Sequence, residues 1–345
     1  MSGDTAFMKP VVREADTFRE RAKILRFLRA FLSPDIDELR LEWLYFANPH
    51  GHARVWLLEV NAETIGAGAA IPRRIRMSSS QKAGCILGDF CVSPNYRSVG
   101  PALQLQRACM QAVGSGWSQL AYDLPSVSML AVYRRLGFRS NASLVRMAKP
   151  LQMDRQVRGR VNSSRASKVV GGVGNVLLMA RDRIRRTDRS LQIQKHEGHL
   201  GEEFDVLLES VATSTAEWLV ERSSTYLNWR FREHPKAAYT IWTARRNGYL
   251  EAYAVTQNRE QDVLVADLFG VDKPRLLETL MLSLADSTRG GSLETLSVPM
   301  LSGHPWQERL TEIGFYPRES SALVVHSEQP GTNIPGWLTD GDRDS

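Results

Sequence analysis

The chain has 345 residues, of which 43% are hydrophobic and 24% are charged, and its formal net charge is +6. This balance is typical of a soluble globular protein and excludes a disordered or membrane-embedded chain. The length exceeds what one ordinary core needs and indicates two domains.

The sequence shows no membrane-spanning segment, disulfide framework or metal site. Apolar stretches such as 169–180 fall short of the ~20 residues that cross a bilayer, and the N-terminus lacks a basic-then-apolar signal. Cys85, Cys91 and Cys109 form no C-x-x-C pair, which argues against disulfides and a zinc ribbon. The seven histidines are scattered, so we predict no metal. We expect a cytoplasmic protein.

In the first 150 residues, helical spacing of apolar residues gives way to short apolar runs and then returns. The expected helices are 17–32, a second one opened by Ser33-Pro34, 102–113 and 126–136. The expected strands are 53–60, 64–71, 84–92 and 119–122. The first three strands should form an antiparallel meander. The predicted order is therefore α-α-β-β-β-α-β-α.

A basic segment separates the two halves of the chain. Between Arg155 and Ser190 stand ten Lys or Arg and two Asp, among many Ser and Gly. We interpret 151–195 as a linker with either a solvated face or an affinity for an anionic surface such as a membrane. At the other end, 329–345 is predicted to be an acidic, disordered tail.

The second half, 196–328, repeats the order of the first. The expected helices are 203–213, 224–232, 274–288 and 305–313, and the expected strands are 239–245, 249–257, 262–269 and 295–298. Asp89-Phe90-Cys91 corresponds to Asp267-Leu268-Phe269, and Leu136-Gly137-Phe138 corresponds to Ile313-Gly314-Phe315. A duplicated domain explains both matches. The predicted fold class is α/β (α+β), with two tandem domains that each hold a mixed, mostly antiparallel twisted sheet flanked by helices.

The segment 92–102 connects a predicted strand to a predicted helix. At such a junction, successive backbone N–H groups and the helix dipole can hold a diphosphate. Gly100 would let the backbone approach a phosphate closely, and Ala102 would keep the next turn free of bulk. Unlike a dinucleotide-binding fingerprint, this loop follows an antiparallel meander.

This segment resembles the GNAT N-acetyltransferase superfamily, whose signature is Val-x-Pro-x-Tyr-Arg followed by Arg/Gln-x-x-Gly-x-Gly/Ala. The matching residues are Val92, Pro94, Tyr96, Arg97, Gly100 and Ala102. A second landmark of the superfamily, a tyrosine four residues before Gly-Phe, is matched by Tyr133. Pro101 departs from the pattern, because it lacks an N–H that could face a phosphate. The motif resemblance covers residues 84–138, in the domain at 1–150.

The resemblance implies acyl transfer from acetyl-CoA, or another acyl-CoA, to a primary amine. The implied cofactor-binding residues are Cys91, Val92, Arg97, Ser98, Val99, Gly100 and Ala102. A β-bulge before the loop would splay neighbouring strands and admit the pantetheine arm. Tyr133 would protonate the leaving thiolate. Asp89, on the strand before the loop, would be either the base that deprotonates the amine or a brace of the core, since Asp267 has the same place in the second half.

The second half lacks these features. Residues 270–275 contain no Arg-x-x-Gly-x-Ala, and Leu310 replaces the tyrosine. We expect no acyl transfer there, and a role in shaping the acceptor site. Trp229 and Arg230 are candidates for contacting a sugar amine, while the alternative packs Trp229 in a core.

The leading hypothesis is an acetyl-CoA-dependent N-acyltransferase acting on an amino sugar or another small amine. A peptidoglycan-type (FemAB-like) aminoacyl ligase using aminoacyl-tRNA, and a non-catalytic binding protein of the same fold, remain alternatives. For the leading hypothesis we expect no nucleic-acid partner, and a peripheral membrane contact would use the basic linker.

Overall fold

The computed structural model describes residues 9–77, 80–97, 99–114, 116–140, 142–152, 188–214, 218–289, 293–327 and 336–343. It divides into two compact units, each described by itself. The first unit contains 1–142, 321–334 and 343–345, and the second contains 143–320 and 335–342. Most of the predicted linker, 153–187, lies outside the described residues. No helix in the described portion of the chain is long and apolar enough to cross a membrane.

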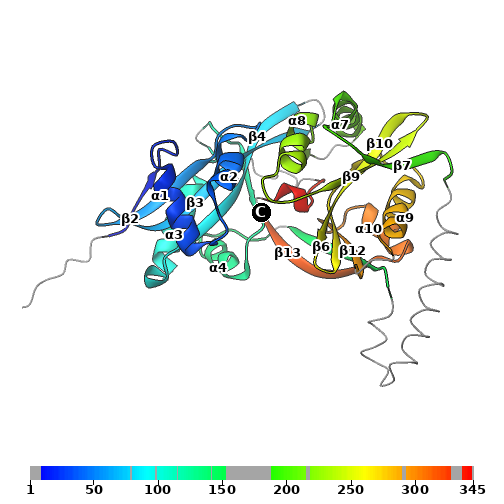
Figure 1. The fold of residues 1–345 in the computed structure, drawn as a ribbon. Helices are drawn as coiled ribbons and strands as arrows, with labels where there is room; N and C mark the ends of the chain where they lie inside the picture. The colour runs from blue at the N-terminus through cyan, green and yellow to red at the C-terminus, as the bar shows by residue number, and fades with distance from the viewer. Residues whose placement is uncertain are drawn as a thin grey trace, which may run out of the picture. The chain divides into compact units, whose positions relative to one another are not determined.

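The first unit is a sheet covered by helices (Figure 1). Its strands are β1 (Val11–Glu14), β2 (Arg54–Val60), β3 (Glu63–Met77), β4 (Ser80–Val92), β5 (Leu120–Asp123) and the end of β13 (Tyr316–Ser327). Its helices are α1 (Arg21–Phe31), α2 (Glu38–Leu41), α3 (Val99–Met110) and α4 (Val127–Arg135), with a π-turn η1 (Glu42–Phe46) and a 3-10 turn η2 (Pro94–Tyr96). The sheet is antiparallel except where β4 runs parallel to β5. The predicted mixed, mostly antiparallel architecture is confirmed.

Small residues on β3 let α3 approach the sheet. A Cβ atom on Gly68 would lie 2.8 Å from the Cys109 sulfur of α3, and one on Gly66 would lie 3.2 Å from Leu105. A contact of 2.8 Å is essentially absent for real Cβ atoms, and one of 3.2 Å is unusually tight, so glycine at these positions lets the helix lie close to the sheet. Helix α1 contributes its own apolar face, which buries Leu25 and Leu28. Together these helices fix the surroundings of β4.

Strands β4 and β5 pair over three residues and then diverge. The parallel pairs run from Gly84–Leu120 to Ile86–Tyr122. Strand β5 ends at Asp123, whereas β4 continues to Val92. The described residues show no β4–β5 pair beyond these three. The last residues of β4 therefore border an opening in the sheet.

The β-bulge expected before the loop is present in β4. Ala67 pairs with Cys91, but Ala69 pairs with Gly88, so Asp89 and the following residue together face one residue of β3. Asp89 has a φ of 46°, in the left-handed region that Asp and Asn tolerate better than most residues. A bulge of this kind bends its strand and increases the local twist. It thus helps to turn β4 away from β5.

The second unit repeats this plan. Its strands are β6 (Ala142–Pro150, from residue 143), β7 (Leu191–His196), β8 (Trp218–Val220), β9 (Thr240–Arg246), β10 (Tyr249–Arg259), β11 (Asp262–Gly270), β12 (Thr295–Leu301) and the start of β13. Its helices are α7 (Glu202–Ser214), α8 (Ser224–Leu227), α9 (Leu276–Thr288) and α10 (Trp306–Glu312), with a π-turn η3 (Asn228–Arg232) and a 3-10 turn η4 (Asp340–Asp342). The strand order is β13-β6-β12-β11-β10-β9-β7.

Two local features match between the units beyond the predicted repeat. Strands β11 and β12 also form three parallel pairs, from Asp262–Thr295 to Leu264–Ser297. In both units a four-residue α-helix runs directly into a five-residue π-turn, in α2–η1 and in α8–η3. Each π-turn has a buried tryptophan at its second position, Trp43 or Trp229.

The unit boundaries differ from the predicted 1–150 and 196–328. Strand β6, the last strand of the first half, belongs to the second unit and pairs with β12. The end of β13, the last strand of the second half, belongs to the first unit and pairs with β5. Hydrophobic periodicity reports which face of a strand is buried but not which distant strand is its neighbour. For that reason, the sequence could not show this exchange.

The end of the chain also differs from the prediction. Residues 336–343, expected within a disordered tail, are packed into ordered structure, and Leu338, Asp340 and Asp342 are buried. Trp337 and Leu338 supply apolar burial, and arginines neutralise the two acids. The acidic composition alone was therefore misleading. Residues 328–335 of the predicted tail lie outside the described residues.

Candidate functional site

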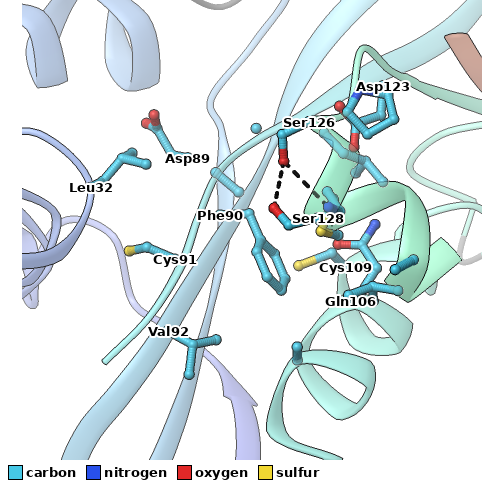
Figure 2. A pocket seen from close by; sticks show the side chains of 18 of the residues that line it. Leu32, Asp89, Phe90, Cys91, Val92, Gln106, Cys109, Asp123, Ser126 and Ser128 are labelled. Carbon is cyan, nitrogen blue, oxygen red and sulfur yellow. Dashed lines mark hydrogen bonds between the residues drawn. The ribbon is translucent and has the colours of Figure 1, made fainter. Parts of the chain in front are cut away.

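A cavity of about 710 Å³ lies in the first unit where β4 and β5 diverge. Residues 87–92 of β4 form one wall, and the end of β5 with the start of α4 forms another. Figure 2 shows Leu32 on one side of β4, and Gln106 and Cys109 of α3 on the other. The opening predicted to result from splayed strands is therefore present.

Most of the cavity lining is apolar, with a few charged groups. Two carboxylates, Asp89 and Asp123, and two arginines, Arg97 and Arg135, belong to the lining. Such a surface suits a ligand with a long apolar or amide-bearing arm and an anionic end.

The loop between β4 and α3 is held by its own hydrogen bonds and leaves the Arg97 side chain exposed. The N–H groups of Tyr96 and Arg97 are used within the loop, since they donate to the carbonyls of Ser93 and Pro94. The side-chain Nε of Arg97 lies 3.4 Å from the Val92 carbonyl, which holds this arginine at the end of β4. Arg97 is exposed, so its guanidinium remains accessible to an anion.

At the start of α3 the backbone is open to solvent. A Cβ on Gly100 would meet no protein atom within 4 Å. Packing within the chain therefore does not explain this glycine, whereas space for a ligand against the backbone would. Pro101 stands in the first turn of α3, where its missing N–H costs no intrahelical bond.

The predicted cofactor residues gather at this end of the cavity. Cys91, Val92, Arg97 and Ala102 line it, and Gly100 lies beside it in the first turn of α3. Val99 begins α3, and Ser98 lies outside the described residues.

Asp89 is held by two partners in the core. Its carboxylate accepts hydrogen bonds of 3.0 and 2.9 Å from the Arg40 guanidinium and one of 2.7 Å from the Tyr45 hydroxyl. Only 6% of the residue is exposed. A carboxylate in a bidentate ion pair has its lone pairs directed at that partner. The arrangement corresponds to the bracing alternative for this residue.

Asp123, at the end of β5, is a lining residue that the sequence reasoning missed. The Tyr133 hydroxyl donates a 2.7 Å hydrogen bond to Asp123 and accepts one of 2.8 Å from Gln106. Tyr133 is 1% exposed, while both of its partners line the cavity. A carboxylate at the carboxyl end of a parallel strand, where two strands diverge, is the signal that could have identified it.

The ionisation of Tyr133 is strongly perturbed. Burial, and then the charge and hydrogen bond of Asp123, raise the pKa of Tyr133 well above its ordinary value. The hydroxyl therefore keeps its proton at neutral pH. Perturbed titratable groups beside a cavity are typical of reactive sites.

The cavity thiols are unsuited to nucleophilic catalysis. Burial raises the pKa of Cys91 to about 12, and it raises the pKa of Cys109 as well. Because the thiolate is the nucleophilic form, these thiols are inert near neutral pH. Among the described residues, no three His, Cys, Asp or Glu side chains are grouped closely enough to hold a metal ion.

The predicted acceptor-binding pair lies in the interior of the second unit. Trp229 is 3% exposed and packs 5.5 Å from the Tyr226 ring. Arg230 is 2% exposed, and its Nε donates to the Gly341 carbonyl at 2.7 Å. Neither side chain is placed to contact a sugar, so the core-packing alternative fits these residues.

Comparison with known proteins shows similarity in structure only. No protein-family model and no curated protein sequence matches the chain. A GCN5-related N-acetyltransferase from Anabaena variabilis is similar with a TM-score of 0.67 at 11% identity, over 92% of this chain and 73% of that one.

Two further solved structures have comparable likeness. A conserved protein from Enterococcus faecalis gives a TM-score of 0.66 at 12% identity, over 93% of this chain and 72% of that one. A GCN5-related N-acetyltransferase from Kribbella flavida gives 0.62 at 12% identity, over 92% and 71%. These likenesses extend over nearly the whole chain. The chain therefore has the fold of the GCN5-related N-acetyltransferases.

Proposed function

We propose that the first unit is an N-acyltransferase that moves an acetyl or other acyl group from acyl-CoA to a primary amine, on an amino sugar or another small molecule. The observation that carries this proposal is the cavity between the diverging ends of β4 and β5, with an open helix start at its rim. Fold likeness alone does not assign an activity, so the proposal depends on the site.

The residues present fit coenzyme A. The edge of β4 beside the opening offers main-chain groups to an amide-bearing arm, as an added strand would use them. The open backbone at Gly100 and the exposed Arg97 suit a diphosphate. When bound, acyl-CoA supplies the acyl group as an activated thioester.

We assign the acid–base work to Asp123 and Tyr133. Asp123 lines the cavity and would take a proton from the attacking amine. Tyr133 retains its proton and donates a hydrogen bond to Asp123, so the pair can return a proton to the departing sulfur. Asp89 is not used as the base, because Arg40 and Tyr45 occupy its carboxylate.

The residues at the corresponding positions of the second unit support the assignment of Asp123 and Tyr133. Aligning the three parallel pairs of each unit places Val298 where the first unit has Asp123. The Gly-Phe match places Leu310 where it has Tyr133. Neither replacement can carry a proton, so we propose that acyl transfer belongs to the first unit alone.

Calorimetric titration of the full chain with acetyl-CoA tests the proposal. We expect micromolar binding with one site per chain, followed by amine-dependent release of free thiol in a screen of amino sugars and small amines. A chain that shows no binding at millimolar acetyl-CoA would overturn the proposal and leave the ligase and the non-catalytic binding protein. Binding without thiol release for any amine would favour the binding protein.

A further inference from the structure

The second unit has its own divergence of parallel strands, and that place is filled. Residues of the turn η4 contact both β11 and β12. The segment 336–342 belongs to this unit, and Leu338, Thr339, Asp340 and Asp342 are at most 5% exposed. In the first unit the corresponding region of the sheet borders the cavity described above.

A tryptophan anchors the segment to β11. The indole N–H of Trp337 donates a 2.8 Å hydrogen bond to the carbonyl of Leu268. Its ring packs edge-on against Trp306 at 4.8 Å and against Phe269 at 5.1 Å. By the repeat, Leu268 corresponds to Phe90, a residue of β4 that lines the first cavity. The indole therefore uses the β11 edge that corresponds to a cavity wall.

Charge complementarity holds the rest of the segment. Arg222 contacts Asp342 at 2.8 Å and Asp267 at 3.1 Å, and all three side chains are at most 3% exposed. Burial alone would lower the pKa of Arg222, but the charges of Asp267 and Asp342 raise it well above its ordinary value. Arg259 contacts Asp340 at 3.2 Å. The segment is acidic, and the groove presents arginines to it.

One backbone carbonyl and one hydroxyl of the segment are also hydrogen-bonded directly. Arg230 donates from Nε to the Gly341 carbonyl at 2.7 Å, and the Thr339 hydroxyl donates to Asp267 at 2.8 Å. A Cβ on Gly341 would lie 2.8 Å from the Phe231 ring and 3.2 Å from the Ala266 carbonyl. A larger residue therefore does not fit at that position.

We infer that the cleft of the second unit is a peptide-binding groove whose ligand is the chain's own segment 336–342. The ligand chemistry is a short acidic peptide with one indole anchor and an obligatory glycine. This copy binds a peptide where the first unit has its cavity, and the groove is specific for sequence because it contacts an indole, two carboxylates and a bare backbone. The inference stands on the second unit alone and does not depend on the proposed acyl transfer.

The test keeps the chain intact while it folds. A protease recognition sequence is inserted between residues 330 and 331 and cut after purification. We expect the released C-terminal peptide to remain bound through gel filtration at micromolar concentration. Excess fluorescent peptide of sequence 335–345 should exchange into the cut protein with a stoichiometry of one, and should not bind the uncut chain.

Matched peptides then test specificity. Trp337→Ala and Gly341→Leu peptides should each bind the cut protein at least tenfold more weakly, whereas Ser345→Ala should bind as the parent does. Separation of the cut peptide during gel filtration, or equal affinity of the Trp337→Ala peptide, would overturn the inference. A chain that ends at residue 334 provides a second measurement: when it is folded by near-ultraviolet circular dichroism, it should bind the peptide and gain thermal stability.

Discussion

The clefts of the two units begin alike and end differently. In both, two parallel strands share three pairs before they diverge. In the first unit the divergence opens into a cavity with Asp123 and Gln106 in its lining. In the second, Trp337 and its neighbours pack into the corresponding place. The same strand geometry can therefore serve either a ligand or the chain itself, and the side chains around the opening decide which.

The carboxylate next to the opening behaves the same way in both units. Asp89 pairs with Arg40 and Tyr45, and Asp267 pairs with Arg222 and accepts from the Tyr253 hydroxyl at 2.7 Å. An arginine plus a tyrosine hydroxyl thus fixes this aspartate whether or not a cavity is present. The same arrangement in the filled cleft supports the bracing alternative for Asp89.

The largest effect is expected on acetyl-CoA affinity, from a large side chain placed in the open space at Gly100. Gly100→Trp should weaken acetyl-CoA binding by about 1000-fold, roughly 4 kcal/mol, because the side chain would occupy the space proposed for the diphosphate. Thermal stability should hold, since a Cβ there meets no protein atom within 4 Å. Calorimetry and thermal melting measure the two quantities.

A matched control exists in the second unit. Gly201 immediately precedes a helix, and a Cβ on it likewise meets no atom within 4 Å. Gly201→Trp should leave acetyl-CoA binding unchanged. Equal loss of affinity in both variants would show that the Gly100 result does not report on a cofactor site.

The next effect separates bracing from catalysis at Asp89. Asp89→Asn should destabilise the folded chain by about 3 kcal/mol, because it leaves the Arg40 guanidinium without its buried carboxylate charge. Asp267→Asn should cost less, about 1.5 kcal/mol, because Asp342 still neutralises Arg222. Denaturant unfolding measures both. If Asp89→Asn instead lowers kcat 100-fold at unchanged stability, Asp89 is the base.

A smaller effect is expected on turnover from the cavity acid–base pair. Asp123→Asn should lower kcat about 100-fold at an unchanged acetyl-CoA Kd, because it removes the proton acceptor and not the cofactor contacts. Tyr133→Phe should lower kcat as well, with the same cofactor affinity, since Phe cannot donate to Asp123. Steady-state kinetics with a responsive amine measures both variants. Full activity of either one would remove that residue from the mechanism.

The sequence predicted the features of the site that depend on local patterns. The loop at Arg97 and Gly100 follows from residue spacing, and the bulge at Asp89 follows from the resemblance that this spacing supports. Asp123 was missed because its role depends on a hydrogen bond to Tyr133, ten residues away on another element. No periodicity reports such a contact.

The predictions that failed are those decided by distant contacts. Strands β6 and β13 pair with strands of the opposite half, and which distant strand becomes a neighbour is set by tertiary packing. The C-terminal acids have the composition of a solvated tail, yet Asp342 is buried against Arg222, more than a hundred residues earlier in the chain. Charge composition describes a segment in isolation, and here a buried arginine reverses its meaning.

The smallest expected effect is the contribution of one histidine to the pH dependence of the free energy of unfolding. This residue is His304, whose ring lies beside Trp337 in the filled cleft. Burial lowers the pKa of His304 from 6.5 to about 4, and its Nδ1 accepts the Trp306 backbone N–H at 3.1 Å, which requires an unprotonated nitrogen. The unfolded chain gains a proton near pH 6.5 while the folded chain does not, so stability is full above that pH and falls as the pH drops toward 4. Between pH 6.5 and 5 the loss should be about 1.6 kcal/mol. His304→Asn keeps an acceptor for the Trp306 N–H and should remove this contribution to the change of unfolding free energy with pH, which denaturant unfolding measures. As a control, the same change at the exposed His52 of the first unit should leave that pH dependence as it is. If the pH dependence of unfolding is unchanged in His304→Asn, then packing in the filled cleft does not keep His304 unprotonated. The contrast between the two clefts would then depend on Trp337 and the ion pairs alone.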